Sequence, residues 1–134
     1  MGTRSSIHLL ASLLSPPPSD MQTWSNEFDV IAPIALAAGH ELNLDTLVDA
    51  VIGAHAGRTR DGSPAPYVIH PMRVALALLT LFPDGLAGAP AADMFAAGLA
   101  HDVIEEAPEF TNSLRMTTNS QVFDAVVQLS KPPA

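Results

Sequence analysis

Apolar residues recur every three or four positions through most of the chain after residue 23, which is the spacing of one face of an α-helix. This pattern predicts helices over 24–38, 43–57, 71–82, 91–106 and 121–129, whereas 111–119 is weakly patterned. No segment of useful length alternates apolar and polar residues as a strand does, and the sequence has no internal repeat. We therefore predict an all-α fold of about five helices.

Proline and glycine mark the connections between these helices. The segments 57–66 and 83–90 hold several of both, and loops of this kind on a rigid scaffold often carry binding groups. Pro33 is expected to kink the first helix, and Pro71 stands in the first turn of the third, where a missing N–H costs least. The helix over 91–106 is so uniformly apolar that we expect it to be buried centrally.

We expect one domain over 23–134, preceded by a flexible extension over 1–22. Pro and Ser dominate the end of this extension, and translation can begin at Met1 or at Met21. Its apolar stretch, 7–14, is too short to span a bilayer, and no other stretch is long enough without a break. We predict no transmembrane helix.

Acidic residues outnumber basic ones. Six Lys and Arg against fourteen Asp and Glu give a formal net charge of −8, so the chain as a whole should repel nucleic acid and anionic membranes. Cysteine is absent, which excludes disulfides, thiolate metal sites and a cysteine nucleophile, and which fits a cytoplasmic protein. Any metal site must therefore use histidine and carboxylate ligands.

His101 and Asp102 are adjacent on the helix predicted to be buried. An unpaired carboxylate in apolar surroundings would lose most of its hydration energy, and a divalent cation removes that objection. His70, at the start of the preceding helix, is the natural third ligand because consecutive helices with a short connection pack side by side. Imidazole with carboxylate suits manganese, iron, zinc or nickel better than calcium.

Several motifs together resemble the hydrolase domain of the RelA/SpoT alarmone enzymes. The resemblance covers roughly residues 28–131. The matching positions are His55, Gly57, Arg60, Gly62, Pro66, Tyr67, His70, Pro71, Val74 and Ala75, the run 97–105 and the closing segment 126–131.

This resemblance implies a helical HD-domain fold that uses Mn²⁺ to remove the 3′-pyrophosphate of guanosine tetra- or pentaphosphate, giving GDP or GTP and pyrophosphate. It implies that His70, His101 and Asp102 are the metal ligands. It further implies that Glu105, together with Glu106, orients or deprotonates the attacking water. A guanine nucleotide is then the expected small-molecule partner.

The resemblance also implies substrate-binding residues. Arg60 matches an arginine that lies against the guanine base in the family, and Tyr67 precedes the ligand histidine as it does there. Arg58 and Arg73 are candidate phosphate contacts. His55 matches a family histidine that is not a ligand, and its helix-end position favours a structural hydrogen bond or a contact with the helix dipole.

The chain departs from the family in its metal ligands. The family's fourth ligand is an aspartate on a helix beyond the segment that matches 126–131, so the domain is expected to lack its last helices, as a fragment or as a degenerate copy. Glu106 stands where the family usually has aspartate. Three alternatives follow: a stand-alone hydrolase, a catalytically inactive nucleotide-binding or regulatory module, and a truncated product that folds poorly.

Overall fold

The structure is a computed structural model that describes residues 21–59 and 64–129. Its elements in chain order are α2 (Met21–Glu41), α3 (Asp45–Ala54), α4 (Ile69–Leu81), α5 (Ala91–Ala100), α6 (Val103–Glu106), the 3₁₀ turn η1 (Pro108–Phe110), α7 (Thr111–Thr117) and α8 (Ser120–Leu129). Within this described part there is no strand, only two isolated β-bridges. The predicted all-α class is confirmed.

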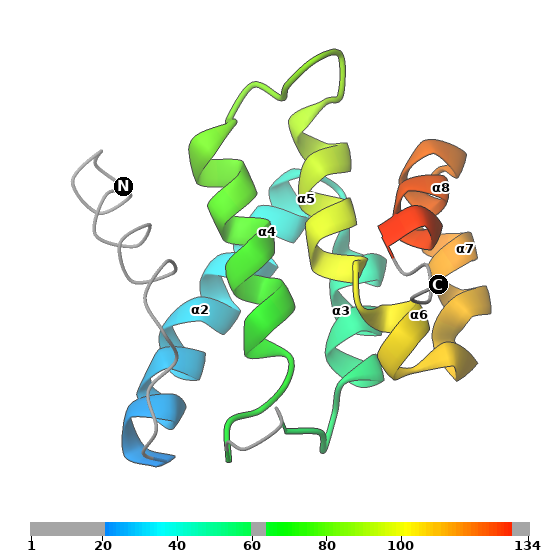
Figure 1. The fold of residues 1–134 in the computed structure, drawn as a ribbon. Helices are drawn as coiled ribbons and strands as arrows, with labels where there is room; N and C mark the ends of the chain where they lie inside the picture. Colours follow the sequence, from blue (N-terminus) through cyan, green and yellow to red (C-terminus); the bar gives the residue numbers. More distant parts are fainter. Residues whose placement is uncertain (1–20, 60–63, 130–134) are drawn as a thin grey trace.

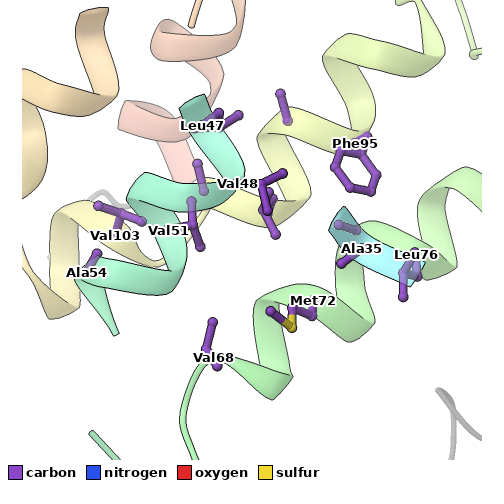
Figure 2. Packing of buried hydrophobic residues seen from close by; sticks show 14 of the residues in the cluster. Ala35, Leu47, Val48, Val51, Ala54, Val68, Met72, Leu76, Phe95 and Val103 are labelled. Carbon is purple, nitrogen blue, oxygen red and sulfur yellow. The ribbon is translucent and has the colours of Figure 1, made fainter. Parts of the chain in front are cut away.

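Helix α2 packs on α3 and α4, α3 packs on α5 and α7, and α8 packs on α5 (Figure 1). Their contact is an apolar core to which α3, α4 and α5 contribute Val48, Met72 and Phe95 (Figure 2). Phe95 and Leu99 are fully buried, which agrees with the prediction that the apolar segment after residue 90 is central. None of the described helices combines the length and the hydropathy needed to cross a membrane.

The prediction of one continuous helix over 91–106 is wrong. Helix α5 ends at Ala100, and α6 begins at Val103 after a turn at His101 and Asp102. His101 Nδ1 lies 2.6 Å from the carbonyl oxygen of Gly98, an acceptor that a continuing helix would use for the N–H of residue 102. The side chain of His101 thus competes with the backbone ladder where the helix breaks.

Helices α4 and α5 form an antiparallel hairpin (Figure 1). In its connection, Gly85 has φ +87° and lies against the backbone of Ala89, a position that a side chain would obstruct. Along the hairpin, a Cβ added at Gly98 would meet Leu78 Cδ1 at 2.8 Å and Ala75 Cα at 3.3 Å, so the two helices approach closely at that glycine. The start of α4 and the end of α5 therefore lie at the same end of the hairpin.

Candidate metal centre

The three predicted metal ligands lie together where α4 begins and α5 ends. His101 Nε2 is 3.2 Å from His70 Nε2, and Asp102 Oδ2 is 3.1 Å from His101 Nε2 and 3.3 Å from His70 Nε2. One ligand atom from each residue fits within a span of 4.8 Å. Within 21–59 and 64–129, this is the one group of three or more such side chains close enough to share a metal ion.

Each ligand owes its place to a local feature of the backbone. His70 is the second residue of α4, so its ring extends from the first helical turn. His101 follows the last residue of α5, and Asp102 precedes the first residue of α6. The turn between α5 and α6 therefore lets two adjacent side chains reach the same point, which neighbours on a continuous helix, about 100° apart, do less readily.

The hydrogen bond to Gly98 defines the tautomer of His101. A carbonyl oxygen only accepts, so Nδ1 must carry a proton and donate it to Gly98 at 2.6 Å. In the neutral ring the lone pair is then on Nε2, the atom that faces His70 and Asp102. Metal-binding histidines commonly donate their second ring nitrogen to a carbonyl in this way.

Tyr67 supports the carboxylate of Asp102. Its hydroxyl donates a hydrogen bond of 2.7 Å to Asp102 Oδ2, the oxygen that also faces both histidines. Behind it, the ring of His55 lies with its centroid 4.8 Å from that of Tyr67. Tyr67, which the resemblance assigns to substrate binding, therefore contacts a candidate metal ligand directly.

Electrostatics favour an ionised carboxylate beside a basic imidazole. Burial acts to raise the pKa of Asp102, but hydrogen bonds from His101, His70 and Tyr67 outweigh it and hold the pKa well below its usual range. Burial also lowers the pKa of His101, yet the hydrogen bonds to Asp102 and to the Gly98 carbonyl, with the charges of Asp102 and Glu105, raise it overall. The cluster therefore attracts positive charge.

The donor set fits a divalent transition metal. Two imidazole nitrogens and one carboxylate oxygen converge, and these ligand types suit Mn²⁺, Fe²⁺, Zn²⁺ and Ni²⁺. All three side chains are partly shielded, with 28%, 20% and 15% of His70, His101 and Asp102 exposed, so an ion held there would still be reached from solvent. The residues present could hold such an ion, with positions left for water or substrate.

The two glutamates that are predicted to take part in catalysis lie on α6, directly after His101 and Asp102. Glu105 is exposed and close enough for its charge to act on His101. Glu106 is half-buried one residue later. Their roles in orienting or deprotonating water stay predictions.

The predicted substrate arginines are not part of the described cluster. Arg58 forms an exposed ion pair with Glu109 of η1, with Arg58 Nη2 3.7 Å from Glu109 Oε2. Arg60 lies outside the described residues. The expectation that Arg73 contacts phosphate is wrong, because Arg73 is 8% exposed and its Nε lies 2.6 Å from Glu27 Oε1, between α4 and α2.

The expected structural hydrogen bond of His55 is also absent from the part of the chain that the structure describes. Both ring nitrogens are buried and neither has a hydrogen-bond partner there. Burial is the main cause that lowers the pKa of His55 to about 4, so the ring is neutral at pH 7. Its ring packs against the ring of Tyr67, and the two ring planes are tilted by 37°.

Two features of the site were not predicted from the sequence. The bond between Tyr67 and Asp102 and the donation from His101 to Gly98 both depend on how the turn between α5 and α6 is shaped. The nearest signal in the sequence is Gly98 itself, three residues before His101.

A scan against protein-family models and searches of curated proteins and of solved structures find no match.

Proposed function

We propose that this protein is a metal-dependent phosphohydrolase that removes the 3′-pyrophosphate of guanosine tetra- or pentaphosphate in the cytoplasm, with Mn²⁺ as its cofactor. The observation that carries the proposal is the convergence of His70, His101 and Asp102 within 4.8 Å at the end of the α4–α5 hairpin. The substrate class rests on the resemblance of this segment to the RelA/SpoT hydrolase domain.

A divalent cation held by these ligands lowers the pKa of water and polarises a phosphoryl oxygen, which is the chemistry that phosphate ester hydrolysis needs. The protein's own part is to hold and orient the ligands. Gly98 keeps His101 Nε2 turned toward the site, and Tyr67 keeps Asp102 ionised and in place. Glu105, on the next turn, is the candidate group to accept a proton from the attacking water.

The reaction consumes one water molecule. The water oxygen bonds to the phosphorus attached to the 3′ oxygen, and the bond between that phosphorus and the 3′ oxygen breaks. One proton of the water ends on the 3′ oxygen of the nucleotide, and the other stays with the pyrophosphate. Pyrophosphate and GDP or GTP are the products. No oxidant or second substrate is needed.

The test is pyrophosphate release from guanosine tetraphosphate by the purified chain with added Mn²⁺. We expect turnover that is lost after chelation of the metal and in His101→Ala and Asp102→Ala. His40→Ala is the matched control, because His40 is 63% exposed on α2, where it pairs with Asp45. Absence of turnover in well-folded protein that binds Mn²⁺ would contradict the proposal.

A nucleotide-binding module without catalysis is the second candidate. The number of protein ligands favours this candidate, because the described residues supply three ligands to the cluster whereas the resemblance implies four. It predicts that guanosine tetraphosphate binds in an equilibrium measurement while pyrophosphate release stays at the level of Asp102→Ala. The same two assays therefore separate the two functions.

A further inference from the structure

The buried ring of His55 lies behind the candidate metal centre. His55 is the residue that caps the C-terminus of α3, and it is 1% exposed. Burial is the main cause of its lowered pKa, and the charges of Asp102, Arg58, His101 and His70 also act on it. The ring is therefore within electrostatic reach of all three candidate ligands, although it is not one of them.

The contact that joins His55 to this site is its packing on Tyr67. The two ring centroids are 4.8 Å apart, and the ring planes are tilted by 37°. Aromatic rings attract one another in offset or tilted arrangements with centroids about 4.5–7 Å apart. The hydroxyl of the same Tyr67 ring donates to Asp102 Oδ2 at 2.7 Å. One rigid ring thus connects His55 with the carboxylate of the cluster.

The end of α3 also holds the backbone of Tyr67. The N–H of Arg58 donates to the carbonyl oxygen of His55 at 3.1 Å, and the N–H of Tyr67 donates to the carbonyl oxygen of Arg58 at 2.8 Å. Thr59 and Pro66 form an isolated antiparallel bridge beside this bond. These backbone contacts fix where the side chain of Tyr67 begins, whereas its rotamer is chosen by the side chains that pack on it.

The hydrogen bond to Asp102 depends on that rotamer. An O–H···O bond is about 2.5–3.0 Å long and weakens steeply when the angle at the hydrogen becomes small. The hydroxyl lies at the end of the side chain, so a small rotation about the Cα–Cβ bond of Tyr67 displaces it from Asp102. A buried ring packed on Tyr67 restricts this rotation, and His55 supplies such a ring.

We propose that His55 is a positioning residue of the metal centre, which acts through the ring of Tyr67 to keep the tyrosine hydroxyl on Asp102. This inference rests on the proposed metal site and adds to it a residue of α3. The role needs the flat ring of His55 and not its nitrogen atoms, which are buried and have no hydrogen-bond partner among residues 21–59 and 64–129. Variants that keep a ring at this position should therefore differ from variants that lose it.

Tyr67 is the single tyrosine of the chain, so tyrosine labelled with ¹³C at Cζ, the carbon that bears the hydroxyl, gives one NMR signal. In the metal-free full chain we expect the signal of His55→Leu to lie close to that of Asp102→Ala, which has no acceptor for the hydroxyl. His55→Phe, the matched control that keeps a ring, should leave the signal nearly in place. Adding His55→Leu to Asp102→Ala should move it little further, which separates a lost hydrogen bond from a lost ring neighbour.

The affinity for Mn²⁺ is the second readout. We expect His55→Leu to weaken binding about fivefold, within the range of one aromatic contact, and His55→Phe to change it by less than about twofold. In a Tyr67→Phe background there is no hydroxyl to position, so adding His55→Leu should cost less than about twofold. A general loosening of the fold would instead lower the affinity equally in both backgrounds. His55→Met, which also lacks a ring, takes the place of His55→Leu if that variant does not fold.

Three results in well-folded protein would overturn the proposal. They are an unmoved tyrosine signal in His55→Leu, an equal shift in His55→Phe, and a loss of Mn²⁺ affinity that is the same with and without the Tyr67 hydroxyl. Failure of the unmodified chain to bind Mn²⁺ would contradict the proposed metal site itself. The tyrosine signal needs neither metal nor substrate, so it would still show whether His55 holds the hydroxyl on Asp102.

Discussion

Helix α4 contributes one residue to each of two groups of polar side chains, about one turn apart, and the two groups differ in how their charges are balanced. Arg73 is buried against Glu27 at 2.6 Å, so one positive and one negative charge neutralise each other. His70, three residues earlier, faces His101 and Asp102, whose contacting atoms are ring nitrogens and a carboxylate oxygen. The first group is complete within the protein, whereas the second gathers lone pairs toward one point.

This difference separates the two groups by what each needs to remain stable. Two buried opposite charges are stable together when their geometry is good and their remaining polar atoms are hydrogen-bonded. His70 Nε2 and His101 Nε2 lie 3.2 Å apart beside a carboxylate, so either a proton on one of these ring nitrogens or a cation between them offsets the repulsion of their lone pairs. The comparison therefore separates the ion pair of Glu27 with Arg73, which is complete within the protein, from the group at the end of the hairpin, for which we propose metal binding.

Breaking the ion pair should cause the largest change. Arg73→Met leaves Glu27 buried without its partner, and loss of one member of a buried pair costs about 3–5 kcal/mol. Urea unfolding of the metal-free protein should show this loss. The double variant Glu27→Leu with Arg73→Met should recover most of the stability; if it does not, the pair does more than neutralise charge.

Removing the charge of the carboxylate in the cluster should weaken metal binding strongly. Asp102→Asn keeps the shape of the side chain and loses its charge, and we expect the affinity for Mn²⁺ to fall more than about 100-fold, beyond the effect of changing an outer partner. Isothermal titration calorimetry measures it. Asp124→Asn, an exposed carboxylate on α8, is the matched control, and equal affinities in the two variants would contradict a metal site at Asp102.

Acid should destabilise the fold through His55. Its pKa is lowered from 6.5 to about 4, so the unfolded chain binds a proton more readily than the folded one. The folded state therefore loses stability as pH falls from about 6.5 to about 4, by roughly 2 kcal/mol from this residue. Urea unfolding at pH 7 and pH 4.5 should show this loss, and a smaller one in His55→Phe.

Removing the support of Asp102 should have the smallest effect. Tyr67→Phe deletes the hydroxyl that donates to Asp102 Oδ2 and keeps the ring against His55. Partners of metal ligands are worth about 10–100-fold in affinity, and we expect the lower end because both histidines remain. An unchanged affinity for Mn²⁺ in the same calorimetric titration would show that Tyr67 does not position the ligand.

The sequence predicts most of the fold because apolar spacing records which face of each helix is buried. Helix α7 was not predicted, since Leu114 is its one buried residue and a single position gives no period. The break between α5 and α6 was also missed. At this break His101 contacts the carbonyl oxygen of Gly98, and the apolar pattern of the sequence continues through it unchanged.

The site was predicted in part, for a similar reason. The meeting of His70 with His101 follows from the packing of consecutive helices, which needs only their order and a short connection. The pairing of Arg73 with Glu27 depends on how α2 is rotated against α4, and the bond from Tyr67 to Asp102 depends on the geometry of a turn. The spacing of residues along the chain determines neither the rotation of α2 against α4 nor the geometry of that turn.

The closeness of α4 and α5 at Gly98 also bears on the spacing of the proposed metal ligands. Because a Cβ at this position would press on Leu78 and Ala75, the size of residue 98 sets how far apart the two helices lie. That separation in turn affects the distance between His70 on α4 and His101 at the end of α5. We expect Gly98→Ala to push α5 away from α4 and to move His101 away from His70, so the proposed metal site depends on a residue that has no side chain.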